Sequence, residues 1–124
     1  MLHTETAPVI DALMEPSDGS IDPARLARML HMTMSDLANL VRLHRNTLAR
    51  APSSPKAQER LRVIARVLAD AADLMDGNMV RTCLWFTTLP LSGFGGKTAA
   101  DLVKSGNERA VHIHIQMLRD GVYA

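Results

Sequence analysis

Few side chains in this chain have the type and spacing that catalysis or metal binding requires. His112 and His114 are of a metal-ligating type, but two residues apart on a helix they project to nearly opposite sides, and no third ligand accompanies them. Cys83 is the single cysteine and has no neighbouring base to activate it, which favours a small buried side chain. Asp70 and Asp73 share a helix face, where we expect solvated carboxylates. The sequence therefore predicts a protein that is not an enzyme and holds no metal or other cofactor.

A glycine-rich loop is the segment most suggestive of ligand binding. Gly96, Lys97 and Thr98 end residues 91–98 (LSGFGGKT) in the manner of a phosphate-binding P-loop. That motif requires a glycine five residues before Gly96, where this chain has Leu91, and a strand before the loop. We therefore do not expect nucleotide binding. The loop N–H groups and the Lys97 ammonium still offer a place for an anion.

The charge is distributed unevenly, although the formal net charge is only +1. Residues 1–21 carry four acids and no Lys or Arg, and residues 22–66 carry nine bases against three acids. Residues 67–124 are nearly neutral, with five bases and six acids. A basic middle segment is typical of a nucleic-acid-binding module, but a solvated, arginine-rich helix face has the same composition. Charge alone leaves both interpretations open.

Nothing in the sequence resembles a secretory signal peptide or a membrane span. No stretch approaches the roughly 18 consecutive apolar residues of a membrane span. The first 16 residues contain acids and lack the basic start of a secretory signal. A single cysteine also permits no internal disulfide, which suits a reducing compartment. We expect a cytoplasmic protein with no membrane partner.

The segments that carry these residues are predicted to be helical. Aromatic residues make up only 3% of the chain while Leu, Ala and Met are abundant, which favours helices. Asp22, Thr98 and Asn107 are suited to begin helices, and Gly77 to end one with a positive φ. We expect an all-α fold, a small helical bundle, with helices over residues 8–14, 22–30, 35–41, 45–50, 55–76, 78–88, 98–103 and 107–120.

One segment and the domain organisation need separate comment. Residues 111–117 alternate between apolar and polar side chains, which is also a strand pattern. A lone strand would have no partner in a helical chain, so we interpret this segment as helix. We divide the chain into an N-terminal region (1–54), a long connecting helix (55–76) and a C-terminal domain (77–124).

A helix-turn-helix pattern lies in the basic segment, over residues 35–50. Ala38 is the small residue where the two helices would cross. Apolar anchors are expected from both helices: Leu37, Val41, Leu43 and Leu48. Arg can pair with guanine and Asn with adenine in the major groove, while flanking Arg side chains contact phosphates. The predicted DNA contacts are those of the turn and the second helix: Arg42, His44, Arg45, Asn46, Thr47 and Arg50.

The same residues resemble the Xre-like helix-turn-helix. In that pattern the turn usually carries Gly, where this chain has Arg42, and an Arg at positive φ costs about 1 kcal/mol relative to Gly. His44 takes the cap position of the second helix. The resemblance implies sequence-specific DNA binding, and a dimer would present two recognition helices to a palindromic operator.

A second resemblance covers the C-terminal half. A helix with Leu84 and Trp85, the glycine-rich loop of residues 91–98, and a last segment Gly-Val-Tyr-Ala at 121–124 follow one another in order. This set resembles the C-terminal toxin-binding domain of the MbcA/ParS/Xre antitoxin family. Together with the upstream turn, the resemblance covers roughly residues 22–124. The chain departs from the family in having Ala where Pro commonly follows the loop threonine.

The family resemblance implies a partner and a mechanism. The expected partner is a RES-domain toxin, of a class that attacks NAD or transfers ADP-ribose, and the chain would neutralise it by covering its active-site cleft. The residues expected to contact the toxin are those of the loop and of the last segment: Phe94, Gly95, Gly96, Lys97, Thr98, Gly121, Val122, Tyr123 and Ala124. Trp85 and Phe86 are expected in the core. A homodimer that also regulates its own operon is expected, and the alternative is a stand-alone helix-turn-helix regulator whose C-terminal domain dimerises.

Overall fold

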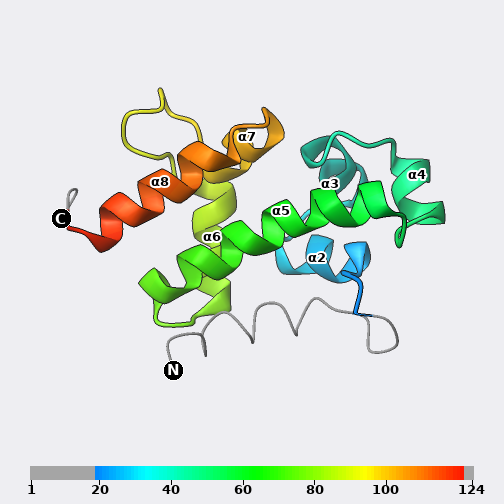
Figure 1. Ribbon diagram of the computed structural model, residues 1–124, viewed down its shortest axis with the longest axis horizontal. Helices are drawn as coiled ribbons and strands as arrows, with labels where there is room; N and C mark the ends of the chain where they lie inside the picture. The colour runs from blue at the N-terminus through cyan, green and yellow to red at the C-terminus, as the bar shows by residue number, and fades with distance from the viewer. Residues whose placement is uncertain (1–18, 122–124) are drawn as a thin grey trace.

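A computed structural model describes residues 19–121, and every regular element in that range is a helix (Figure 1). The elements are, in chain order, α2 (Pro23–Met29), α3 (Met34–Leu40), α4 (Arg45–Arg50), α5 (Pro55–Ala72), the 3-10 helix η1 (Asp73–Met75), α6 (Met79–Thr88), α7 (Ala99–Lys104) and α8 (Glu108–Arg119). The expected all-α fold is therefore confirmed for this range. The helix expected over residues 8–14 lies outside the described residues. None of the helices from α2 to α8 has the length and apolar content that crossing a membrane requires.

Side-chain caps explain where the first two helices begin. Asp22 caps α2 by accepting a hydrogen bond of 3.0 Å from the amide two residues on, and Pro23 stands at the first helical position, as expected. The start predicted for α3, at residues 35–36, is wrong. Thr33 is the cap, because its Oγ1 accepts from the amide of Asp36 (3.0 Å) while the Asp36 carboxylate accepts from the Thr33 amide (3.4 Å). This reciprocal capping box starts α3 at Met34, one to two residues earlier than predicted.

The longest helix ends in a tightened turn. α-Helical hydrogen bonding in α5 stops at Ala72, and η1 continues as a single 3-10 turn. Asp76 and Gly77 both have a positive φ, of 54° and 74°, and the Gly77 amide donates to the carbonyl of Ala72 (2.9 Å). The prediction that Gly77 ends this helix with positive φ is confirmed. The sequence predicted an α-helix as far as residue 76, which is too long. Residues 73–75 form a 3-10 turn instead, before the chain reverses direction.

One hydrophobic core runs through the described range. α5 is its central element, crossing the molecule from α4 at one end to α6 and α8 at the other (Figure 1). The largest fully buried side chains come from several helices, and they include Leu61, Ile64 and Leu68 of α5, Phe86 of α6 and Ile115 of α8. As far as they are described, the three predicted divisions of the chain therefore share one core.

The segment with two possible interpretations is helical. Residues 111–117 belong to α8, which packs against α5 and α7. Val111 and Ile115, four residues apart, are fully buried, whereas Ile113 between them is 47% exposed. Helical periodicity, and not strand alternation, thus decides which apolar side chains reach the core. Asn107 precedes α8, but its side chain forms no capping hydrogen bond there.

Candidate interaction surfaces

The connection between α3 and α4 is a tight turn centred on Arg42. Arg42 has a positive φ of 59°, as expected for the position that usually holds Gly. The amide of Leu43 donates to the carbonyl of Ala38 (2.9 Å), which brings the two helices together at that small, buried residue. Leu37 and Leu48 are fully buried beneath them. These two predicted apolar anchors therefore lie in the core beneath the point where α3 and α4 cross, as the helix-turn-helix pattern requires.

The residues predicted to contact DNA on α4 all lie on its exposed side. His44 caps the helix, since its Nδ1 accepts from the amide of Asn46 (3.1 Å). Leu48 is the one buried side chain of this helix. The polar side chains that face solvent on α4 and at its cap are those of His44, Arg45, Asn46, Thr47 and Arg50. The arrangement is suited to a recognition helix, and their contact with DNA stays a prediction.

Arg42 is placed differently from the other five predicted DNA contacts. Its Nη1 donates to the carbonyl oxygens of Val103 (3.1 Å) and Lys104 (2.9 Å), which are among the last carbonyls of α7. Arg60 of α5 in turn donates to the carbonyl oxygens of Val41 (2.7 Å) and Arg42 (3.2 Å). A cation at the carboxyl end of a helix is favourable for both the hydrogen bonds and the helix dipole. The Arg42 side chain therefore joins the α3–α4 turn to the C-terminal half.

The glycine-rich loop between α6 and α7 is closed by its own backbone. The amide of Leu91 donates to the carbonyl of Lys97 (2.9 Å), and the Lys97 amide donates to the carbonyl of Phe94 (3.2 Å). Gly95 and Gly96 have φ of 63° and 86°, a region that favours glycine, and both are exposed with Lys97. Because the Lys97 amide already has a partner, this loop does not present the row of free amides that a P-loop offers.

Thr98 begins α7 as predicted and does so with a second capping box. Its Oγ1 accepts from the amide of Asp101 (3.1 Å), and the Asp101 carboxylate accepts from the Thr98 amide (3.0 Å). The hydroxyl of Thr98 is therefore used inside the chain. Of the predicted toxin contacts in this loop, Phe94 and residues 95–97 provide the accessible surface.

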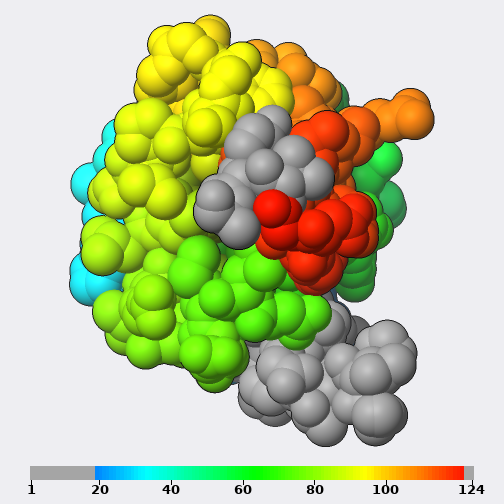
Figure 2. All heavy atoms as spheres, turned by 90° about the vertical axis from the view of Figure 1, so that its left-hand side faces the viewer, coloured from blue at the N-terminus to red at the C-terminus, as the bar shows by residue number. Residues whose placement is uncertain are grey.

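An apolar hollow of about 230 Å³ lies where this loop meets α8. Figure 2 shows the loop, in yellow, beside the end of α8, in red. Ile113 and Met117 of α8 are 47% and 37% exposed at the hollow, and Phe94 of the loop lines it with them. The Phe94 ring meets the imidazole of His114 edge to face, with centroids 6.1 Å apart. The sequence analysis missed this hollow, although the helical spacing of residues 113 and 117 was available to indicate it.

Burial changes the protonation chemistry of two side chains in this half. His114 is buried, and desolvation lowers the pKa of its imidazole, which favours the neutral ring beside Phe94. Burial also raises the pKa of the Cys83 thiol, which makes the reactive thiolate scarce. The predictions that Cys83, Trp85 and Phe86 are buried side chains are confirmed.

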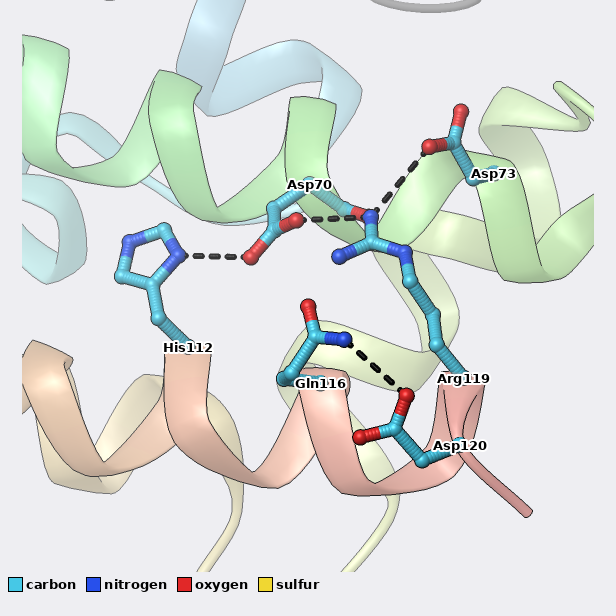
Figure 3. A network of polar contacts seen from close by, with 6 residues as sticks. All are labelled: Asp70, Asp73, His112, Gln116, Arg119 and Asp120. Carbon is cyan, nitrogen blue, oxygen red and sulfur yellow. Dashed lines mark hydrogen bonds and ion pairs between the residues drawn. The ribbon is translucent and has the colours of Figure 1, made fainter.

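The two histidines of α8 have separate surroundings, and His112 belongs to an ionic network with α5 (Figure 3). His112 Nδ1 lies 2.7 Å from one carboxylate oxygen of Asp70, and Arg119 Nη2 lies 2.7 Å from the other. Arg119 also contacts the Asp73 carboxylate (3.2 Å). The expectation that Asp70 is simply solvated is wrong, since its side chain is 23% exposed and held from both sides. The network fastens α8 along α5.

The last segment is only partly described. Gly121 follows α8 with a φ of 79° and is exposed, and residues 122–124 lie outside the described residues. The predicted toxin contacts Val122, Tyr123 and Ala124 therefore stay predictions. Within residues 19–121 no three His, Cys, Asp or Glu side chains gather as metal ligands would.

Comparison with known proteins adds no assignment. No family model matches the sequence, no curated protein is significantly similar to it, and no solved structure is significantly similar to its fold.

Proposed function

We propose that this chain is the antitoxin of a toxin–antitoxin pair, and that it binds a RES-domain, NAD-using toxin through its C-terminal half and covers the toxin's active-site cleft. The resemblance of residues 74–124 to the family's toxin-binding domain supplies the partner. The observation that carries the proposal is the apolar hollow formed by Phe94, Ile113 and Met117 next to an exposed glycine-rich loop.

The hollow has the composition of the centre of a protein interface. Exposed Ile and Met side chains beside the half-buried Phe94 ring are costly to leave in water, and aromatic residues and Met are enriched where proteins associate. Ser92 and His114 add polar groups to its lining, and the exposed residues Gly95, Gly96 and Lys97 follow Phe94 in the same loop. An apolar centre within a polar rim is the arrangement in which hot-spot residues are found. Residues 121–124 continue from the same helix and would extend the contact across the cleft.

A pair of matched variants tests this proposal. Ile113→Asp places a charge in the hollow, and Val80→Asp places the same charge on α6, where Val80 is 75% exposed. We expect Ile113→Asp to abolish inhibition of NAD turnover by the co-expressed toxin and Val80→Asp to keep it. Inhibition retained by Ile113→Asp would show that the hollow is not the docking surface. Deletion of residues 121–124 tests the last segment separately, and full inhibition after that deletion would remove it from the mechanism.

A second activity, operator binding, is favoured by one specific observation: α4 presents five exposed polar side chains within the basic part of the chain. A homodimer would place two such helices on a palindromic operator and let the protein regulate its own operon. Arg45→Ala together with Asn46→Ala should abolish operator binding and leave toxin inhibition unchanged. If both mutated side chains prove neutral for operator binding, α4 is not the recognition helix. If no toxin is inhibited but the operator is bound, the chain is a stand-alone regulator with a dimerising C-terminal domain.

A further inference from the structure

The end of α7 lies beside the α3–α4 turn, although Lys104 follows Arg42 by 62 residues in sequence. Arg42 Nη1 donates to the carbonyl oxygens of Val103 and Lys104, and α7 packs against α3 (Figure 1). Arg42 itself stands two residues before His44, the cap of α4. The backbone of Lys104 is therefore separated from the candidate recognition helix by one arginine side chain and two residues of chain.

Two arginine side chains hold this arrangement together. Arg60 of α5 donates to the carbonyl oxygens of Val41 (2.7 Å) and Arg42 (3.2 Å), which fastens the α3–α4 turn to α5. On the other side, a Cβ atom placed on Gly106 would lie 3.7 Å from Nη1 of Arg42, so the turn that follows α7 touches the Arg42 side chain. The α3–α4 turn and the α7–α8 turn (residues 105–107) therefore form one connected unit.

Cations outnumber carboxylates where these two turns meet. Arg42 and Arg60 donate to carbonyl oxygens, which leave both positive charges uncompensated. Glu108 lines a small hollow with both arginines, but within residues 19–121 it is not at ion-pair distance from either. Lys104 is exposed, and it too has no ion pair in that range. The potential at this junction is therefore positive, next to the basic start of α4.

Lys104 also has a local role that must be told apart from any binding role. It stands in the last turn of α7, where a cation interacts favourably with the helix dipole. Arg42, however, already donates to the carbonyls of residues 103 and 104. The exposed Lys104 ammonium is therefore left to interact with a partner outside the chain.

We propose that Lys104 contacts a phosphate of the DNA beside the recognition helix, so that the C-terminal half takes part in operator binding. This inference rests on the proposed binding of an operator by α4. A helix in the major groove is flanked by backbone phosphates, and cations near its start contact them. Lysine suits this contact, because its ammonium is a point charge on a long, flexible side chain. Phosphate contacts carry no sequence information, so Lys104 contributes equally to every DNA sequence.

The salt dependence of DNA binding measures such a contact. Each phosphate neutralised by a cation releases counterions, which steepens the fall of log K with log salt by about 0.9. Fluorescence anisotropy compares two duplexes, one from the promoter of the chain's own operon and one of the same composition in scrambled order. Lys104→Ala removes the charge and Lys104→Arg keeps it. Arg81→Ala, on the exposed surface of α6, removes one charge elsewhere as the matched control. Circular dichroism confirms that each variant is folded.

We expect Lys104→Ala to weaken the binding of both duplexes roughly five- to tenfold at about 0.1 M salt, and to lower the slope by about 1 for each bound chain. Lys104→Arg and Arg81→Ala should keep the slope of the unsubstituted chain. A role confined to the dipole of α7 would instead change stability and leave the slope as it is.

An unchanged slope for Lys104→Ala would overturn the inference. Operator binding would still stand in that case if Arg45→Ala together with Asn46→Ala weakens the promoter duplex and not the scrambled one. An equal fall in slope for Arg81→Ala would also overturn the inference, because the effect would then come from net charge and not from the position of Lys104. If the unsubstituted chain binds neither duplex, operator binding by α4 fails and this inference fails with it.

Discussion

The exposed side of α4 and the hollow beside α8 differ in how their residues are brought together. The candidate DNA contacts on α4 are nearly consecutive in sequence and come from a single helix and its cap. Phe94, by contrast, lies on a loop and meets Ile113 and Met117 only because α8 folds back along it. A surface made by one helix can be proposed from the sequence, whereas a surface made by two segments depends on packing.

The two surfaces also differ chemically, and the difference fits different partners. The α4 surface is polar and basic, which suits the phosphates and base edges of nucleic acid. The α8 hollow is apolar with a neutral imidazole at its base, which suits another protein. Arg42 connects the two, since it belongs to the α3–α4 turn but binds the end of α7. The four predictions below test how separate the two surfaces are.

The largest effect is expected at Leu48, the buried residue that holds α4 on the core. Leu48→Ala should lower the free energy of unfolding by about 2–5 kcal/mol, because it removes a fully buried side chain and leaves a cavity. Operator affinity, measured by fluorescence anisotropy below the melting temperature, should fall with it. Toxin inhibition under the same conditions should persist. A parallel loss of toxin inhibition in the folded variant would contradict the separation of the two surfaces.

Arg42 tests the connection between them. Arg42→Ala should lower the free energy of unfolding by about 1–2 kcal/mol, because it removes the hydrogen bonds to α7 and keeps a side chain at positive φ. Arg42→Gly removes the same hydrogen bonds but relieves the strain, so we expect it to be about 1 kcal/mol more stable than Arg42→Ala. Urea denaturation of both variants provides the measurement. Equal stabilities would mean that backbone strain at this turn is negligible.

The two capping boxes allow the same change to be made in each half. Thr33→Ala in α3 and Thr98→Ala in α7 should each cost about 1 kcal/mol, since each removes a hydroxyl that accepts a backbone N–H. Ser at either position is the control, because it keeps the hydroxyl. Thermal unfolding monitored by circular dichroism checks both. A cost confined to Thr98 would show that α3 owes its start to packing and not to its cap.

The smallest effect is a pH dependence from His114. Because burial lowers the pKa of this imidazole below its ordinary value of 6.5, the unfolded chain takes up the proton first as the pH falls. The contribution of His114 to stability is therefore complete above pH 6.5 and is lost as the pH falls below it. Urea denaturation between about pH 7.5 and pH 5.5 should show a smaller decline for His114→Gln than for the unsubstituted chain. His31→Gln, at an exposed histidine, serves as the control and should keep the full decline.

Prediction from the sequence succeeded where the signal is local. The caps at Asp22 and Thr98, the positive φ of Gly77 and the burial of Phe86 all follow from a residue and its neighbours within about one helical turn. The start of α3 was predicted one to two residues late, because Thr33 caps this helix with Asp36 as its partner. Two neighbouring residues that can both cap a helix, such as Thr33 and Ser35, differ little in capping free energy, so packing can decide between them.

By itself, the sequence determined that this chain is helical and where most of its helices begin, because capping, helix propensity and apolar spacing act over a few residues. Tertiary structure alone decided that Arg42 binds carbonyls 61 and 62 residues further on, and that Asp70 is held by His112, 42 residues away. The same holds for the apolar hollow beside α8, which is lined by the loop that carries Phe94 and by α8. These long-range contacts depend on how the helices pack on α5. The sequence around each residue does not indicate which distant residue it will contact.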